Sequence, residues 1–126
     1  MSRILMVDDV AAFRQMARAV LSFEGHALLE ADNGPQSVVM AAQTQPDLVL
    51  MDIWMPGVYD GLEACRRIRQ LPGLTEVPVI ILTASADTNL QAQARAAGAC
   101  AYLVKPFRPS ELLRVVAQCM AAPAEA

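Results

Sequence analysis

The sequence lacks two features that would place the chain in a specialised structural class. It has no apolar run near the ~20 residues that a membrane-spanning helix needs, because its longest apolar stretches are only about strand length. Its cysteines, Cys65, Cys100 and Cys119, form no CxxC pair and are odd in number. This pattern favours buried thiols in a reducing cytoplasm over a disulfide framework.

An excess of basic charge is also missing. The chain has 10 Lys and Arg against 13 Asp and Glu, a formal net charge of −3 at pH 7. This balance gives no electrostatic footprint for nucleic acid, so an effect on DNA would require another domain or partner. The first residues, MSRILMVDD, reach acidic side chains too early for a secretory signal peptide. We expect a cytoplasmic protein that contacts neither nucleic acid nor membrane directly.

A large apolar fraction is what the chain does contain. Its 126 residues, 55% of them hydrophobic, suffice for one domain with a proper core and argue against disorder. No internal repeat or low-complexity block interrupts the chain, and only its end, AAPAEA, resembles a tail or the start of a linker. We expect one domain over residues 1–121 and a tail or linker start over residues 122–126.

Five short apolar runs predict five strands. They are ILMV (4–7), ALLEA (27–31), LVLM (48–51), VIIL (79–82) and AYLV (101–104). Four are nearly continuous rather than alternating, which is typical of parallel strands covered on both faces. ALLEA carries a glutamate and is expected at a sheet edge.

Segments with helical spacing separate these runs, and each has a predicted apolar face or end. The first carries the stripe Val10, Phe13, Ala17, Val20 and Leu21 and ends at Gly25; the second is capped by Asn33 and Gly34, with Pro35 in its first turn. The third opens at Gly61 with Leu62, Cys65 and Ile68 inward; the fourth runs from Asp87 to Ala97, with Gly98 as its cap; the fifth turns Leu113, Val116, Ala117 and Met120 inward. Strict alternation of strand and helix predicts an α/β fold with a doubly wound parallel sheet.

Polar residues follow the predicted strands at the edge where such sheets bind ligands. The first strand ends at Asp8 and Asp9, the third at Asp52, the fourth at Thr83 and the fifth at Lys105. The second strand offers only Asp32, a weaker candidate. Three acids, a hydroxyl and a lysine are therefore expected on one rim.

This set of side chains suits one kind of chemistry. Clustered carboxylates repel one another, and an oxygen-only set of ligands favours Mg²⁺, with Mn²⁺ as an alternative. One carboxylate could then attack phosphorus while the metal and the lysine neutralise the phosphoryl oxygens. Taken singly, each residue has a plainer interpretation: acids at a helix start, a threonine cap and a solvated lysine. His26 is interpreted as an ordinary surface residue.

The ordered set ILMVDDV, DLVLMDIWMPG followed by DG, VIILTASAD, GACAYLVKPF and ELL resembles the receiver domains of two-component response regulators, including the chemotaxis regulators. The resemblance covers essentially the whole chain. It implies a flavodoxin-like (βα)5 domain with strand order 2-1-3-4-5.

The resemblance also implies a role for each rim residue. Asp52 is the phosphoacceptor. Mg²⁺ is bound by Asp9, Asp52 and the main-chain carbonyl of Trp54, and by Asp8 through water. Thr83 is the switch hydroxyl and Tyr102 the switch aromatic, while Lys105 binds the phosphoryl group and forms a cis peptide with Pro106.

Two departures from the family pattern lie beside this site. MPGVYDG carries one residue more than usual between the Pro-Gly turn and the Asp-Gly that opens the next helix, and either Val58 or Tyr59 is the extra one. Trp54 is unusually large for a position that borders the phosphoryl group, whereas Ala84, which precedes Ser85 in the same border, is small. We expect the indole either to restrict access to the phosphoryl group or to be an exposed aromatic without a kinetic role.

The resemblance predicts a phosphorylation-dependent switch, not a metabolic enzyme. Its phosphodonor would be a histidine kinase or a histidine phosphotransfer protein. Its output would be a downstream protein or a homodimer, contacted through the helix over 87–97, the strand over 101–104 and the last helix. Two alternatives remain open. A phosphohydrolase of the haloacid dehalogenase type would carry a DxD pair on its first strand, and an interaction module would have no use for the intact acidic set.

Overall fold

Five parallel strands form one sheet in the order β2-β1-β3-β4-β5 in the computed structural model, which describes residues 2–121. The strands are β1 (Arg3–Val7), β2 (Ala27–Ala31), β3 (Leu48–Asp52), β4 (Val79–Thr83) and β5 (Ala101–Val104). This confirms the expected fold class and strand order, and β2 lies at an edge as its glutamate predicted. The expected tail over residues 122–126 lies outside the described part of the chain.

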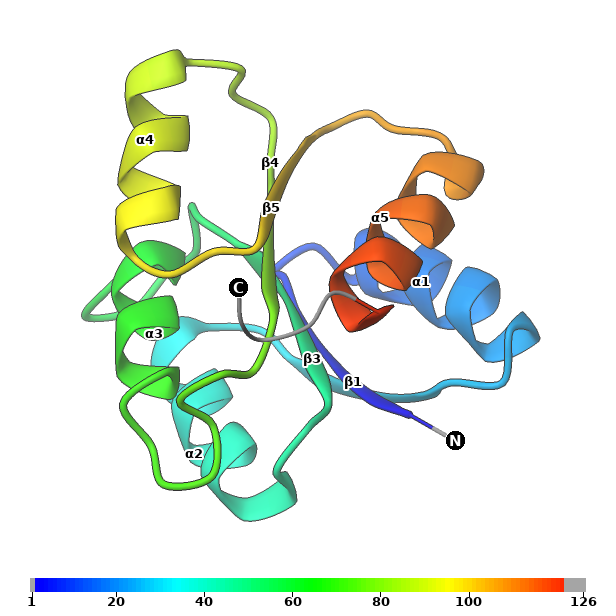
Figure 1. The fold of residues 1–126 in the computed structure, drawn as a ribbon. Helices are drawn as coiled ribbons and strands as arrows, with labels where there is room; N and C mark the ends of the chain where they lie inside the picture. The colour runs from blue at the N-terminus through cyan, green and yellow to red at the C-terminus, as the bar shows by residue number, and fades with distance from the viewer. Residues whose placement is uncertain (1, 122–126) are drawn as a thin grey trace.

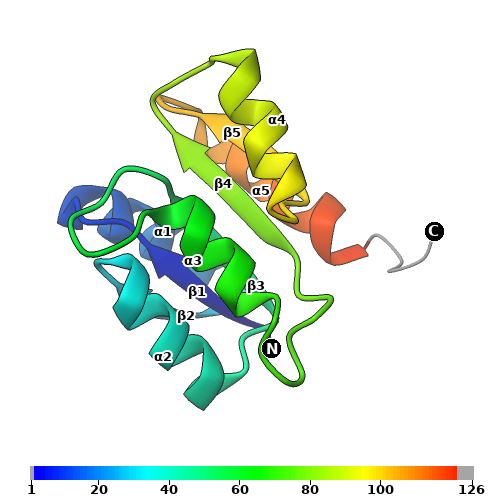
Figure 2. The ribbon, with the colours of Figure 1, turned by 90° about the vertical axis from the view of Figure 1, so that its left-hand side faces the viewer.

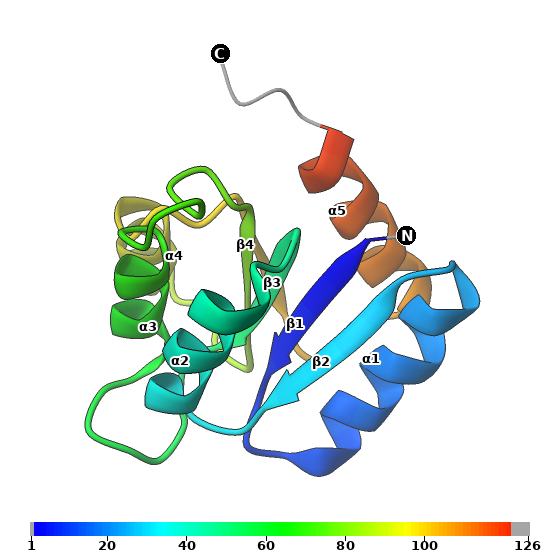
Figure 3. The same ribbon diagram turned by 90° about the horizontal axis from the view of Figure 1, so that it is seen from below.

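Helices cover both faces of the sheet (Figure 1). They are α1 (Ala11–Phe23), α2 (Gly34–Thr44), α3 (Gly61–Ile68), α4 (Thr88–Ala96) and α5 (Pro109–Ala121). Figure 3 shows α1 and α5 on one side of the sheet and α2, α3 and α4 on the other, and Figure 2 looks onto the latter side. Within residues 2–121, no helix has the length and hydropathy needed to cross a membrane.

The sheet separates two hydrophobic cores, because successive side chains of a strand point to opposite faces. In β1, Leu5 and Val7 join a core with α2, α3 and α4, whereas Ile4 and Met6 join a core with α1 and α5. Both sets are fully buried. The nearly continuous apolar runs follow from this arrangement, since every position of a central strand faces one core or the other.

The helix ends follow the sequence signals closely. The Asn33 side chain accepts a hydrogen bond from the Gln36 N–H, and the Asp60 side chain accepts one from the Glu63 N–H, so both are N-caps. Gly98 follows α4 with φ of 102°, as expected of a left-handed cap. Val10 differs from the prediction, because it precedes α1 as its cap residue and is 45% exposed.

The predicted inward face of α5 is wrong by about one residue. The buried residues are Leu112, Val115, Val116 and Cys119, in place of the predicted Leu113, Val116, Ala117 and Met120. Both sets repeat at i, i+3, i+4 and i+7, and apolar residues cover a wide arc of α5 that the polar stripe Ser110, Arg114 and Gln118 interrupts. Periodicity alone therefore could not choose between them.

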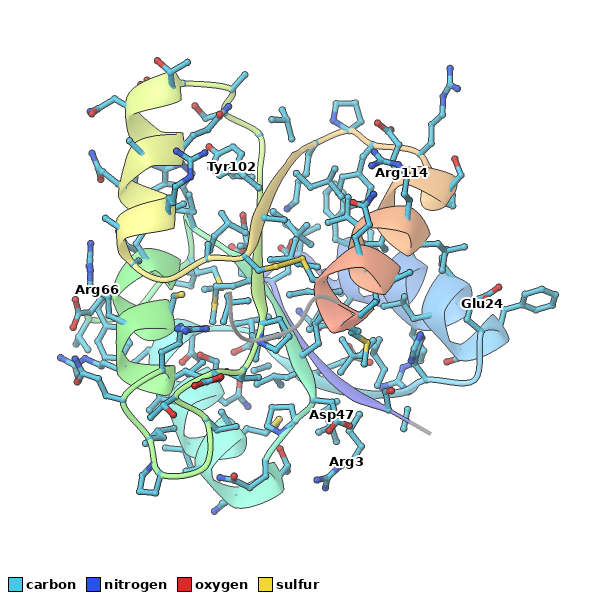
Figure 4. The ribbon with its side chains drawn as sticks, viewed as in Figure 1. Arg3, Glu24, Asp47, Arg66, Tyr102 and Arg114 are labelled. Atoms are coloured by element: carbon cyan, nitrogen blue, oxygen red, sulfur yellow. A yellow bond between two sulfur atoms is a disulfide. The ribbon has the colours of Figure 1, made fainter. Side chains whose placement is uncertain are left out.

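The prediction of three free thiols is wrong for two of them. Cys100 and Cys119 form a disulfide, visible as a yellow bond between the start of β5 and α5 in Figure 4. Cys65 is a free, buried thiol. The pairing depends on Cys119 facing the sheet from α5, a proximity that the odd number of cysteines and the missing CxxC pair do not report.

Gly61 lies where α3 begins against the end of β3. A Cβ at this position would collide with the main-chain oxygen of Asp52, far inside contact distance. The Gly61 N–H also donates to the Ile53 carbonyl at 2.9 Å. Glycine is therefore required here by close approach of two backbones, and that approach holds the segment after Asp52 in place.

We expect Gly61→Ala to destabilise the domain by more than about 3 kcal/mol, because the added methyl group must push aside the backbone at Asp52, which is held at the end of a central strand. Gly25→Ala is the matched control: Gly25 has φ of +87°, but a methyl added there would meet nothing within 4 Å, so it should lose only about 1–2 kcal/mol. Urea unfolding of both variants measures the difference. Equal losses would show that the Gly61 contact is not restrictive.

Candidate functional site

Four neighbouring strands bring their carboxyl ends to one edge of the sheet. Asp8 directly follows β1, and Asp52 and Thr83 are the last residues of β3 and β4. Lys105 directly follows β5, and its N–H donates to the Thr83 carbonyl at 2.8 Å. Because these strands are parallel and adjacent, residues from positions 8 to 105 of the chain meet at one place.

Three carboxylates form a cluster there. One oxygen from each of Asp8, Asp9 and Asp52 lies within 4.8 Å of the other two. Asp8 is fully buried and Asp52 is 6% exposed, whereas Asp9 is exposed. Asp32, the weaker candidate of the rim, is exposed and does not belong to this cluster.

Lys105 is the cation of the cluster. Its ammonium donates to Asp8 Oδ2 at 2.6 Å and lies 3.7 Å from Asp52 Oδ1. The same nitrogen lies 3.9 Å from the centre of the Phe13 ring, a cation–π arrangement. Lys105 therefore forms its shorter ion pair with Asp8 and its longer one with Asp52. Its peptide bond to Pro106 is cis.

Backbone groups also hold the two buried carboxylates. The Val10 N–H donates to Asp8 Oδ1 at 2.9 Å, and the Ile53 N–H donates to Asp52 Oδ1 at 3.0 Å. Among the described residues, no buried side-chain nitrogen or oxygen is left without a hydrogen-bond partner. The acids are thus fixed in orientation and their burial is offset locally.

Asp52 still bears a net electrostatic cost. Its pKa is raised from 3.8 to about 6, first by burial and second by the negative charge of Asp8, with a smaller contribution from Asp9. The positive charge of Lys105 and the Ile53 N–H act in the opposite direction without cancelling the effect. A carboxyl group in this setting favours the protonated form or a second cation.

A divalent cation fits the donor set. All three clustered side chains offer carboxylate oxygen, and the described cluster contains no nitrogen or sulfur ligand. Hard, oxygen-preferring cations such as Mg²⁺ suit this set, while Zn²⁺ does not. The exposure of Asp9 leaves one side of the cluster open to water, which suits a cation that retains part of its hydration.

Thr83, Ser85 and Tyr102 are joined by hydrogen bonds next to the cluster. The Ser85 N–H donates to Thr83 Oγ1 at 3.4 Å, and the Tyr102 hydroxyl donates to the Ser85 carbonyl at 2.8 Å. Thr83 is fully buried, and Tyr102 is half-buried between β5 and α4 (Figure 4). Burial raises the pKa of the Tyr102 hydroxyl above its ordinary value, and the negative charge of Asp87 adds to the effect. The hydroxyl is therefore protonated at neutral pH and can donate this hydrogen bond.

The loop between β3 and α3 carries both departures from the family pattern. Trp54 is 60% exposed and Val58 is 88% exposed. Tyr59 instead packs against the core that the sheet shares with α2, α3 and α4. Its ring lies so close to Gly34 that a Cβ added there would come within 3.1 Å of it. The Arg67 guanidinium lies 4.1 Å from the centre of that ring. Of the two candidates for the extra residue, Val58 is the one that protrudes.

Two residues of α1 border the site without having been predicted there. Phe13 was assigned only to an apolar stripe, yet its ring lies beneath Lys105. The Arg14 side chain donates to the Asp8 carbonyl at 2.6 Å and to Glu30 at 2.9 Å. A basic residue one turn into a helix that follows two acids is the sequence signal that could have identified Arg14. His26, predicted to be an ordinary surface residue, is partly buried between α1 and β2 and does not belong to the cluster.

Asp52→Asn should stabilise the metal-free protein in a pH-dependent way. Because folding raises the Asp52 pKa to about 6 from 3.8, ionised Asp52 destabilises the fold fully above pH 6, and this penalty shrinks as pH falls toward 4. The variant should therefore exceed wild type by roughly 2–3 kcal/mol at pH 8, by roughly 1 kcal/mol at pH 4.5 and by almost nothing below about pH 3.5. Urea unfolding with a chelator measures the difference at each pH. A gap that does not change with pH would contradict the assigned environment of Asp52.

Known proteins share both the sequence and the fold. The family model for the response regulator receiver domain matches residues 4–117. The chain is 41% identical over 117 residues to the transcriptional regulatory protein ResD of Bacillus subtilis, covering 92% of this chain and 47% of that protein. It is 38% identical to protein PilH of Pseudomonas aeruginosa, covering 92% of this chain and 95% of that protein. The chain thus spans about half the length of the first kind of relative and nearly all of the second.

Two solved structures superpose along most of the chain. The receiver domain of the sensor histidine kinase PA1611 from Pseudomonas aeruginosa, solved with magnesium coordinated in its active-site cleft, has a TM-score of 0.87 at 33% identity, covering 96% of this chain and 98% of that one. The chemotaxis protein CheY4 of Vibrio cholerae has a TM-score of 0.89 at 29% identity, covering 94% and 98%. With the family model matching most of the sequence, the chain belongs to the response regulator receiver domain family.

Proposed function

We propose that this domain is a signalling switch that accepts a phosphoryl group on Asp52 from the phosphohistidine of a histidine kinase or phosphotransfer protein. One observation carries the proposal. In a chain of this family, three carboxylate oxygens lie within 4.8 Å of one another, and a lysine lies 3.7 Å from the carboxylate of the central strand. The domain assists its own modification and turns over no metabolic substrate.

Asp52 is the proposed nucleophile because its side chain lies in the cluster and keeps 9% of its surface exposed, whereas that of Asp8 is fully buried. A carboxylate oxygen of Asp52 forms the new bond to phosphorus, the P–N bond of the donor breaks, and the imidazole nitrogen leaves with the electron pair. The Ile53 N–H holds Oδ1 at 3.0 Å. This hydrogen bond fixes the plane of the carboxylate, so its orientation costs little at the moment of reaction.

Asp9, Asp52 and the main-chain carbonyl of Trp54 would hold Mg²⁺ or Mn²⁺, with Asp8 contributing through water. When bound, the cation offsets the charge of the carboxylates and of the incoming phosphoryl oxygens. The raised Asp52 pKa supports this assignment, since a nearby cation favours the ionised, nucleophilic carboxylate.

Lys105 would exchange partners during the reaction. In this structure its ammonium binds Asp8 at 2.6 Å and only approaches Asp52. A phosphoryl group on Asp52 adds oxygens that a lysine binds well, while a cation beside Asp8 takes over the charge that Lys105 now neutralises. The Phe13 ring below the ammonium limits the directions in which the lysine can move.

Trp54, Ala84 and Ser85 would border the phosphoryl group and control access to it. Ala84 is exposed and small, so it leaves the approach to Thr83 open. Trp54 is 60% exposed, which favours the interpretation that its indole acts on approaching molecules more than it seals the site.

The output would use the face formed by α4, β5 and α5. Thr83 and Tyr102 are already connected through Ser85, which supports a route from Asp52 to that face. If Thr83 moves toward the phosphoryl group, it withdraws from the Ser85 N–H, and the hydrogen bond that holds Tyr102 is disturbed. A downstream protein or a second copy of the chain would sense the change. The match to the receiver domain family supports the switch over the haloacid dehalogenase alternative.

Acetyl phosphate with Mg²⁺ should add one phosphoryl group to the wild-type protein, and Asp52→Asn should abolish the addition, because an amide is not a nucleophile. Asp32→Asn is the matched control: Asp32 follows the neighbouring β2 but lies outside the carboxylate cluster, so labelling should be unchanged. Intact mass spectrometry measures both. Full labelling of the Asp52→Asn variant would refute the assignment of Asp52 as the phosphoacceptor, whereas a wild-type protein that takes up no phosphoryl group would favour an interaction module without phosphorylation.

Thr83→Ala should still accept the phosphoryl group on Asp52 but should fail to pass the resulting structural change to α4 and β5, since the hydroxyl that connects Asp52 with that face is gone. In wild type, phosphorylation should alter hydrogen exchange of α4 and β5 amides; in the variant this response should fall by about fivefold or more, the low end of typical coupling between sites. Thr83→Ser retains the hydroxyl and serves as the control. An undiminished response in Thr83→Ala would exclude this route.

A further inference from the structure

The disulfide lies at the opposite end of the sheet from the carboxylate cluster. Cys100 directly precedes β5, and Cys119 lies in the last turn of α5, 19 residues along the chain. The Cα atoms are 6.4 Å apart, within the range that a disulfide accepts without moving backbone. The Cys100 N–H donates to the Val79 carbonyl at 2.7 Å, which fixes this end of the bond beside the start of β4.

The three cysteines differ sharply in access to solvent. Cys100 is exposed. Cys119 is buried, with 7% of its surface exposed, and packs with Leu112, Val115 and Val116 in the core between the sheet and helices α1 and α5. Cys65 is fully buried on the other side of the sheet, and burial raises the pKa of its thiol to about 11. A small thiol or disulfide in solution can therefore reach Cys100 first, Cys119 only from Cys100, and Cys65 not at all.

We propose that Cys100 and Cys119 form a reversible redox site that exchanges with small-molecule thiols and disulfides. Oxidation proceeds in two steps. The Cys100 thiolate attacks one sulfur of a small disulfide and releases one thiolate; the Cys119 thiolate then attacks the Cys100 sulfur and releases the second. Two electrons and two protons pass from the cysteine pair to the small disulfide, which becomes two thiols. An excess of thiol reverses both steps.

The redox state should control how firmly the end of α5 is held. In the disulfide form, a covalent bond joins the last turn of α5 to the start of β5. In the dithiol form, only the apolar contacts of Leu112, Val115, Val116 and their neighbours hold the helix. The bond does not touch Asp8, Asp52 or Lys105, so this inference stands independently of the proposed phosphorylation.

The test equilibrates the full chain in glutathione buffers of varied ratio, then alkylates free thiols and maps them by mass spectrometry. We expect oxidised glutathione to produce an intramolecular bond between Cys100 and Cys119, and excess reduced glutathione to restore two alkylated thiols, while Cys65 stays unmodified until the protein is denatured. Reduction should lower Tm by an amount on the order of 10 °C and speed amide exchange in the last turn of α5.

Matched variants separate the redox site from general effects. Cys65→Ala should keep the glutathione response. Cys100→Ser and Cys119→Ser should each melt near the Tm of the dithiol form of the wild type, in oxidised and in reduced glutathione alike. Three outcomes would overturn the proposal: thiols that stay free in oxidised glutathione, a glutathione adduct or intermolecular bond at Cys100 with Cys119 free, or a disulfide that excess glutathione cannot reduce. Loss of phosphorylation in Asp52→Asn, or its persistence, would leave all of these readouts unchanged.

Discussion

Mutual repulsion among Asp8, Asp9 and Asp52 is the constraint on which the site depends. Two of these acids are buried, and three negative charges within a few ångströms cannot remain ionised there without compensation. Lys105, two backbone N–H groups and the open side at Asp9 supply part of it. The remaining imbalance appears as the raised Asp52 pKa. The fold thus keeps one carboxylate in a state that protonation or an added cation relieves.

The fold could be predicted from the sequence because each central strand is buried on both sides and ends abruptly in a polar residue. That transition locates Asp8, Asp52 and Thr83 at strand ends, and parallel pairing then places them on one edge. Spacing between residues of different elements could not be predicted in the same way. That Lys105 pairs with Asp8 more closely than with Asp52 depends on side-chain directions that no local pattern records.

The wrong predictions for α5 and for the cysteines have different physical origins. Apolar residues cover a wide arc of α5, so its periodicity permits two orientations about its axis that differ by roughly one residue. The disulfide was missed because the prediction used the number and spacing of the cysteines, which do not report that Cys100 and Cys119 lie side by side in the fold. In the loop before α3, the sequence does not decide whether Val58 or Tyr59 is the extra residue, and the two are distinguished only by the packing of Tyr59 against Gly34.

The division of the interior into two cores has an evolutionary consequence. Because the sheet separates the side chains that contact α1 and α5 from those that contact α2, α3 and α4, a substitution in one core leaves the packing of the other intact. The two halves can accumulate changes independently, provided that the polar edge of the sheet is preserved. Because the residues of each core alternate along every strand and recur from one end of the chain to the other, one core can be exchanged whole only by scattered point substitutions and not by recombination of contiguous segments.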